Sequence, residues 1–257
     1  MLINKEIILI LFAFLNCMFL IGYFKKDNGL MDVGWGIGFC IIALYLFFTS
    51  KFKTGLSIII TISVLLWGLR LAIYIFIRNK KHEGEDFRYL NWRKEWGKWV
   101  HLRAYFQVYF LQVSIMYIIA LPIIILYNGP ILKIGWYSIL GLIIYIIGLL
   151  VESIADYQMY NFKNNSTNKG RIMDKGLWKY SRHPNYFGES LIWWGIFLIC
   201  INPPTWQLSI ISPILMTFLL LKVSGVAMLE RKYKGNEAYI NYQRSTSSFI
   251  PWFRKNI

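Results

Sequence analysis

The chain has 257 residues, of which 56% are hydrophobic and 16% are charged, and its mean hydropathy is +0.45. This composition excludes an ordinary soluble domain of this length, which would be less apolar and more charged. The formal net charge of +15 is compatible with nucleic-acid binding, but no nucleic-acid-binding motif accompanies it, so we predict no nucleic-acid partner.

Apolar residues gather in blocks long enough to cross a bilayer, which takes roughly 20 residues per helix. In chain order the predicted spans are 7–24, 33–49, 55–77, 104–127, 134–154, 187–201 and 208–223. Three of these are short, so six or eight spans stay open as alternatives. The predicted fold is therefore all-α, a polytopic membrane protein with a bundle of about seven transmembrane helices. The first block lacks the small-residue cleavage site of a signal peptide and is interpreted as an anchor.

Lysine and arginine alternate between rich and poor segments along this pattern. The rich segments are 25–32, 78–103, 155–186 and 231–257. The poor segments are 1–6, 50–54, 128–133 and 202–207. The positive-inside rule then predicts an outside N-terminus and an inside C-terminus, with the large polar segments facing the cytoplasm and anionic lipid. Abundant Ile, Lys and Asn suggest a bacterial source, hence the bacterial cytoplasmic membrane.

The sequence shows no internal repeat and no linker long enough to separate two folded units, so we predict a single transmembrane domain. Its cysteines, Cys17, Cys40 and Cys200, lie inside predicted spans without metal-ligand spacing, and we predict no metal site. The oligomeric state cannot be predicted from these features.

Ionisable residues at membrane depth are costly and therefore mark candidate functional positions. Asp32 opens the second span, and Arg70 lies inside the third with Trp67 one turn away. Glu152 and Asp156 share one face at the end of the fifth span. Structural alternatives stay open: Asp32 as a helix cap, Arg70 as a buried partner of Asp32 or Glu152, and the Glu152–Asp156 pair as a solvated helix end.

The densest polar stretch is GLWKYSRHPNYFGE, residues 176–189. Pro184 suits the first turn of a helix, whose free N–H groups together with Arg182 and His183 would form an anion site. A phosphate-bearing ligand from the cytosol fits such a site, and the alternative is a basic loop that touches lipid headgroups.

The stretch RHPNYFGE, with ADYQMYNFK before it and ERKYKGNEAYINYQRSTSSFIPWF after it, resembles the steroid 5-alpha-reductase superfamily. The chain looks closest to its bacterial branch, catalogued as a domain of unknown function, which also shows the DVGWG, LWGLRL and EDFRY elements at Asp32–Gly36, Leu66–Leu71 and Glu85–Tyr89. The related isoprenylcysteine carboxyl methyltransferases share RHPNY, a downstream Glu and an Ile-Pro ending, but not these N-terminal elements.

The resemblance implies a membrane enzyme that reduces an activated carbon–carbon double bond of a lipidic, hydrophobic small molecule with NADPH. It implies substrate-side helices in residues 1–127 and a cofactor-binding half, facing the cytoplasm, in residues 128–257. The implied catalytic residues are Asp32, Arg70 and Trp67. The implied cofactor-binding residues are Glu152, Asp156, Lys163, Arg171, Tyr180, Arg182, His183, Asn185, Glu189, Glu230, Arg231 and Tyr233.

The chain departs from the steroid enzymes at four of these positions. It has Glu152 for Asn, Lys163 for Arg, Glu230 for His and Trp67 for a Tyr that binds the ketone. In the expected reaction a donor at the carbonyl oxygen stabilises the enolate that develops. Asp32 could donate there only when protonated, and Arg70 is the alternative. Two other functions stay open: an S-adenosylmethionine-dependent membrane methyltransferase and a non-catalytic lipid-binding protein.

Overall fold

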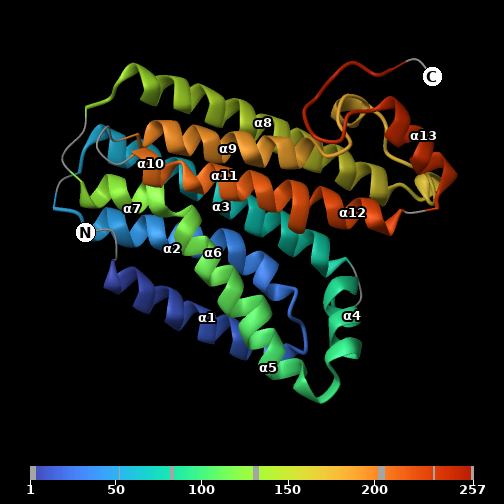
Figure 1. Ribbon diagram of the computed structural model, residues 1–257, viewed down its shortest axis with the longest axis horizontal. Helices are drawn as coiled ribbons and strands as arrows, with labels where there is room; N and C mark the ends of the chain where they lie inside the picture. The colour runs from blue at the N-terminus through green and yellow to red at the C-terminus, as the bar shows by residue number, and fades with distance from the viewer. Residues whose placement is uncertain are drawn as a thin grey trace. The chain divides into compact units, whose positions relative to one another are not determined.

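The computed structural model describes residues 4–51, 53–81, 84–129, 133–201, 206–233 and 235–255. Its described elements are helices, joined by loops and by one isolated bridge between Ser181 and Ser247 (Figure 1). The predicted all-helical fold is thus confirmed. The chain forms two compact units, Met1–Ile134 with Cys200–Ser209, and Gly135–Ile199 with Ile210–Ile257.

The first unit contains four long helical stretches. Its elements are α1 (Lys5–Lys25), α2 (Leu30–Thr49), α3 (Gly55–Lys80), α4 (Phe87–Trp96), the 3-10 helix η1 (Gly97–Trp99), α5 (Val100–Ala104), the π-helix η2 (Tyr105–Phe110), α6 (Leu111–Ile119), α7 (Leu121–Asn128) and α10 (Trp206–Ser209). Asn4 caps α1 by accepting from the N–H of Ile7. Lys26 ends the helix in the left-handed conformation, with φ of 54°.

Helices α2 and α3 meet backbone to backbone through one glycine from each. A Cβ added to Gly36 would lie 2.2 Å from the carbonyl oxygen of Gly68, and one added to Gly68 would lie 2.7 Å from that of Gly36. Gly36 belongs to the DVGWG element and Gly68 to the LWGLRL element. Small residues at a helix crossing in a membrane protein allow this close approach, which gives both elements a packing role.

The second unit is built on a long antiparallel pair, α8 (Trp136–Asn164) and α9 (Pro184–Ile199). Its other elements are the 3-10 helices η3 (Ser166–Asn168) and η4 (Gly176–Lys179), then α11 (Ile211–Phe218), the π-helix η5 (Leu219–Val223), α12 (Val226–Lys232) and α13 (Glu237–Ser245). Glycines 141, 148, 188 and 195 set the spacing of the pair, because a Cβ on any of them would lie 2.6 to 2.7 Å from backbone of the facing helix.

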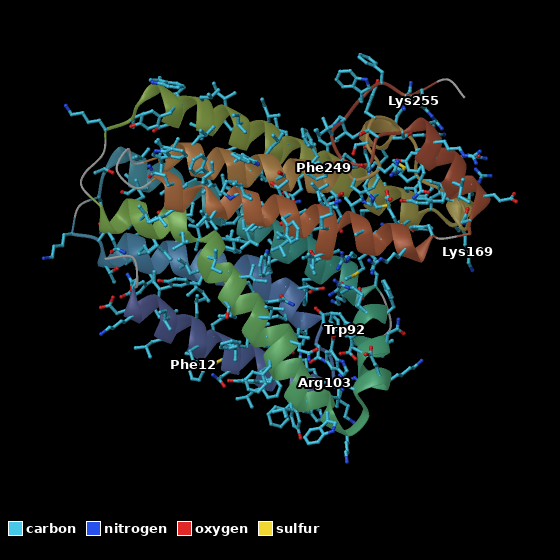
Figure 2. All side chains as sticks on the ribbon, in the orientation of Figure 1. Phe12, Trp92, Arg103, Lys169, Phe249 and Lys255 are labelled. Carbon is cyan, nitrogen blue, oxygen red and sulfur yellow. The ribbon has the colours of Figure 1, made fainter. Side chains whose placement is uncertain are left out.

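Six helical stretches in the described part of the chain are long and apolar enough to cross a membrane, so the chain is an integral membrane protein. They are Lys5–Lys25, Leu30–Thr49, Gly55–Lys80, Phe87–Ile119, Trp136–Asn164 and Trp206–Arg231. Their outer faces carry exposed apolar side chains such as Phe12, which points away from α1 in Figure 2. The predicted sixth span, 187–201, corresponds to α9, whose 16 residues extend only about 24 Å.

The structure corrects the prediction that 78–103 is a polar cytoplasmic loop between two spans. Residues 87–103 are mostly helical, because Asp86 caps α4 by accepting from the N–H of Arg88. Gly97, with φ of 49°, then turns the chain, and the helical path resumes through η1 and α5. The fourth span therefore includes residues that the charge pattern had assigned to the loop.

Candidate functional site

In the first unit, Asp32 is held by two donors from the EDFRY element. Asp32 is the third residue of α2, whose cap position is Gly29. The Tyr89 hydroxyl donates to Asp32 Oδ1 at 2.7 Å, and the Arg88 guanidinium donates to Oδ2. Asp32 therefore does not cap its helix, and both of its carboxylate oxygens accept hydrogen bonds. The arrangement suits an ionised carboxylate, which is an acceptor only.

The same element fixes its own geometry through Asp86. Oδ1 of Asp86 accepts from the backbone N–H of Arg88 at 3.0 Å and from Arg88 Nε at 2.8 Å. One carboxylate thus caps α4 and orients the guanidinium whose other end reaches Asp32. Tyr89 is buried beside it.

Glu85, the first residue of the EDFRY element, fixes the turn that precedes α2. Its Oε1 accepts from the backbone N–H of Asn28 at 2.7 Å, and Arg93 donates to both carboxylate oxygens at 2.8 and 3.0 Å. The side chain of Asn28 accepts from the Tyr109 hydroxyl at 3.2 Å. A buried carboxylate with these partners joins α4 to the start of α2.

We name Asp32, Arg88 and Tyr89 the Asp32 cluster. The EDFRY element supports the family resemblance, but Arg88 and Tyr89 are not among the site residues predicted from the sequence. The signal that could have found them is the Asp86 cap, which predicts a helix start and puts both residues in its first turn.

Trp67 is fully buried on α3, with its ring 5.4 Å from that of Phe39, and Arg70 lies three residues further along α3. The catalytic roles of Asp32, Trp67 and Arg70 stay predictions.

Two aspartates beside this cluster have pKa values shifted in opposite directions. The pKa of Asp27 is raised, mainly because the carboxyl group is partly buried. The hydrogen bond from the Gly29 N–H, 2.8 Å from Oδ1, acts in the opposite direction, and the negative charge of Glu85 raises the pKa further. Burial also acts to raise the pKa of Asp86, but the hydrogen bonds and charge of Arg88 outweigh burial. The pKa of Asp86 therefore lies below its ordinary value of 3.8.

These shifts predict opposite pH dependences for two matched variants. Asp27→Asn is expected to raise Tm at neutral pH and to lose this gain as the pH falls. A carboxyl group whose pKa is raised in the folded protein destabilises the fold only at a pH above its unfolded pKa of 3.8, where it ionises. Asp86→Asn is expected to lower Tm at neutral pH. That loss shrinks as the pH falls through the depressed folded pKa, where the wild-type carboxyl becomes protonated too.

Thermal unfolding of the detergent-purified protein between about pH 3 and pH 7.5 tests both signs, relative to wild type at each pH. Asparagine keeps an oxygen that accepts from the backbone at either position, so each variant removes the charge and leaves an acceptor. Equal Tm differences at every pH would contradict the assignment.

In the second unit, Asn185 and Asp156 meet across the α8–α9 pair. Asn185 Nδ2 donates to Asp156 Oδ1 at 3.2 Å, and Asn185 Oδ1 is buried without a hydrogen-bond partner among the described residues. Glu152 is buried one turn before Asp156, and Glu189 is buried one turn after Asn185. The predicted cofactor residues Glu152, Asp156, Asn185 and Glu189 thus lie at one end of the α8–α9 pair. We call these four the α8–α9 polar group.

Arg182 is used within the protein. Its Nε and Nη2 donate to Glu230 Oε1 at 2.8 and 2.7 Å, and its Nη1 donates to the carbonyl oxygens of Gln243 and Thr246. His183 Nε2 lies 3.5 Å from the same Glu230 oxygen. The structure therefore brings together three predicted cofactor residues from motifs far apart in the sequence, Arg182, His183 and Glu230. Arg182 ties α12 and α13 to the start of α9, and its role toward an anion stays a prediction.

The remaining predicted cofactor residues lie at the edges of this region. Lys163, Arg171 and Arg231 are exposed, at the end of α8, in the following loop and on α12. Tyr180 is 39% exposed. The ring of Tyr233 stacks on that of Tyr239 at 4.5 Å. Within the described ranges, no group of three or more His, Cys, Asp or Glu residues is arranged to hold a metal ion.

Chemically, the α8–α9 polar group offers acceptors in a mostly buried setting. Carboxylates and the free amide oxygen of Asn185 can accept from hydroxyl or carboxamide groups of a ligand. A buried acceptor without a partner costs about 1–3 kcal/mol, and a ligand donor at this oxygen would remove that cost.

Comparison with known proteins gives the chain its family. No solved structure matches it. An uncharacterized protein of Schizosaccharomyces pombe is 25% identical over 221 residues, which cover 76% of this chain and 64% of the yeast protein. The family model described as a protein of unknown function, DUF1295, matches residues 18–246 and so includes both the Asp32 cluster and the α8–α9 polar group. The chain therefore belongs to the DUF1295 family.

Proposed function

We propose that this protein is a membrane-embedded reductase that uses NADPH to reduce an activated carbon–carbon double bond, such as that of an enone, in a lipidic substrate. The observation that supports the proposal is the α8–α9 polar group, in which Oδ1 of Asn185 is buried without a hydrogen-bond partner among the described residues and Asn185 Nδ2 donates to Asp156. The other two members of the group, Glu152 and Glu189, are also buried. The sequence resemblance to steroid 5-alpha-reductases supplies the reaction type.

The polar group fits the neutral part of a dinucleotide. The ribose hydroxyls and the nicotinamide carboxamide of the cofactor carry hydrogen-bond donors, and Asn185 Oδ1 and the Asp156 carboxylate can accept hydrogen bonds from them. Lys163 lies exposed in the last turn of α8, and Arg171 lies exposed in the loop that follows. The positive charges of both side chains suit the phosphates of NADPH. When bound, NADPH supplies a hydride to the double bond of the substrate.

The Asp32 cluster is proposed to act at the substrate carbonyl. Negative charge develops on that oxygen as the double bond accepts hydride, and a positioned donor stabilises it. Arg88 is the candidate donor of this cluster, because its guanidinium has N–H groups beyond those that it donates to Asp32 and Asp86. The single O–H of Tyr89 is donated to Asp32. We infer that Asp32, held in place by Tyr89, orients the guanidinium of Arg88. A protonated Asp32 would keep only its carbonyl oxygen as a good acceptor for one of these two contacts.

Removing this orientation should slow turnover. Once a substrate is identified, Asp32→Ala and Tyr89→Phe are each expected to reduce kcat by about 10²-fold, with a smaller loss for Asp32→Asn, which keeps one acceptor for Tyr89. Single-turnover rates at saturating NADPH and substrate would measure this. Full turnover in both Asp32→Asn and Asp32→Ala would exclude a role for Asp32.

The first experiment tests the cofactor. Binding of NADPH, NADH and S-adenosylmethionine to the detergent-purified protein is compared in wild type, Asn185→Ala and Arg171→Ala. We expect NADPH to bind wild type best. Asn185→Ala should weaken NADPH up to about tenfold, as expected for one lost hydrogen bond, and Arg171→Ala should weaken NADPH more than NADH, since only NADPH carries the 2′-phosphate.

The controls are Asn241→Ala and Arg244→Ala, which make the same chemical changes at exposed positions on α13 and should leave all three affinities unchanged. Binding of S-adenosylmethionine without NADPH would overturn the proposal in favour of a methyltransferase. If no cofactor binds and a lipid does, the protein is a lipid-binding protein.

A further inference from the structure

The segment Thr246–Lys255 follows α13 without a helix of its own, and it is hydrogen-bonded to the stretch before α9. The N–H of Arg182 donates to the carbonyl of Ser247 at 2.8 Å, and the N–H of Trp252 donates to the carbonyl of Tyr180 at 2.9 Å. The Ser181 hydroxyl donates to the carbonyl of Phe249 at 2.7 Å. These contacts fix which side chains of the segment face inward.

Phe249 faces inward and packs edge-on against Phe187, with ring centroids 5.7 Å apart. The next apolar side chains face outward: Ile250, Trp252 and Phe253 are 61%, 68% and 79% exposed. A cluster of large apolar side chains exposed outside any spanning helix marks an interaction surface. Figure 2 shows the segment between Phe249 and Lys255 lying along the rim of the second unit.

Basic side chains occur in the same segment and on the stretch to which it is hydrogen-bonded. Arg254 and Lys255 continue the segment, and Lys175 and Lys179 lie exposed on the stretch to which it is tied. Arg254 pairs with Asp174 at 3.1 Å, which leaves the surface with a net positive charge. Tryptophan and phenylalanine beside lysine and arginine are typical of a protein surface at the headgroup level of a membrane.

The position of the segment along α8 agrees with that depth. The stretch that holds the segment is itself anchored to α8: Trp178 Nε1 donates to the carbonyl of Ala155 at 3.1 Å, and the N–H of Leu177 donates to Gln158 Oε1 at 3.0 Å. The apolar part of this spanning helix ends at about these residues, before the polar run at 161–165. The segment is therefore bound to the stretch that contacts α8 near the end of its apolar part.

We propose that Ile250–Lys255 is an interfacial anchor that inserts its apolar side chains among the headgroups of an anionic leaflet. Its backbone ties to Tyr180 and Arg182 make the anchor continuous with the start of α9. An anionic membrane surface would thereby hold the stretch 174–182 in place beside the α8–α9 polar group. The proposal does not depend on the reductase proposal.

The experiment measures the depth of a single probe. An environment-sensitive fluorophore is attached to Phe253→Cys in a Cys17→Ala background, where Cys40 and Cys200 are buried. A matched probe on Lys169→Cys reports an exposed loop position of the same unit. Both proteins are placed in nanodiscs of phosphatidylcholine, with or without phosphatidylglycerol and with a lipid that carries a nitroxide near its headgroup.

We expect a blue-shifted emission and quenching by the headgroup nitroxide for the probe at 253 but not for the probe at 169. Phosphatidylglycerol should increase the quenching, and Lys179→Gln with Lys255→Gln should remove this increase while the protein stays folded. Equal, water-like emission from both probes would overturn the proposal. Energy transfer between two labelled copies, without quenching by lipid, would also overturn it and assign the surface to a second copy of the chain.

Discussion

Replacing Arg182 by alanine is expected to lower the free energy of unfolding by about 3 kcal/mol, the lower end of the cost of removing one partner of a buried ion pair, because this pair is partly exposed. The side chain of Arg182 is 10% exposed and that of Glu230 is 22% exposed. Without the guanidinium, Glu230 keeps its charge but loses its arginine partner, and the carbonyls of Gln243 and Thr246 lose a donor. The lost contacts bridge three segments of the second unit at once.

The second readout is local. Hydrogen exchange of residues 236–255 should rise sharply in Arg182→Ala, because this side chain is the charged tie between α13 and the start of α9. Arg182→Lys should not restore protection, since an ammonium cannot reproduce the planar set of donors that reach one carboxylate and two carbonyls.

The matched control is Arg254→Ala. It removes an arginine–aspartate pair of the same unit in which both side chains are 37% exposed, and a surface pair contributes about 0–1 kcal/mol. Unfolding in denaturant with linear extrapolation gives both free energies. If Arg182→Ala costs no more than Arg254→Ala, the guanidinium does not organise the C-terminal part of the unit.

Gly188→Ala is expected to destabilise the second unit by about 1–3 kcal/mol, the range observed when extra methylenes are forced into a well-packed core. A Cβ at this position would lie 2.6 Å from the backbone nitrogen of Glu152 and 2.7 Å from the carbonyl oxygen of Gly148. Backbone atoms of two long helices cannot turn aside as a side chain can, so α8 and α9 must separate locally.

This separation should also be felt in the α8–α9 polar group. The Asn185–Asp156 contact of 3.2 Å bridges the two helices within one turn of Gly188. If the proposed function is correct, Gly188→Ala should weaken NADPH as well as lower Tm. Gly188→Leu, with a larger side chain at the same contact, should give little folded protein.

Gly55→Ala is the control for the glycine substitution. Its added Cβ would meet only the side chain of Ile134, at an ordinary contact distance of 3.6 Å, at the first position of α3. Alanine is a better helix former than glycine by about 1 kcal/mol, so this variant should be neutral or slightly stabilised. Equal thermal stability of the Gly188 and Gly55 variants would contradict the close approach of α8 and α9.

The sequence predicted the helical elements well where local chemistry suffices. Long apolar runs determine spans because a bilayer offers no other partner for backbone polar groups. The first three observed spans, Lys5–Lys25, Leu30–Thr49 and Gly55–Lys80, agree with the predicted ones within a few residues at both ends, whereas the later spans differ more. Segment 87–103 does not follow this rule. Residues 87–103 carry Arg, Lys and Glu, which reads as a loop, yet an aspartate cap and contacts such as Arg93 with Glu85 make most of them helical.

The candidate residues show the same division. The sequence by itself marked Asp32 and Asp156, because polar groups in apolar surroundings are rare enough to stand out, and the family resemblance added Asn185 and Glu230. Only the tertiary structure decided their partners: Arg88 and Tyr89 lie 56 and 57 residues from Asp32, and Glu230 lies 48 residues from Arg182. Local patterns reveal which residues are costly to bury, whereas pairing depends on how glycine contacts such as Gly36 with Gly68 and Gly148 with Gly188 bring distant backbones together.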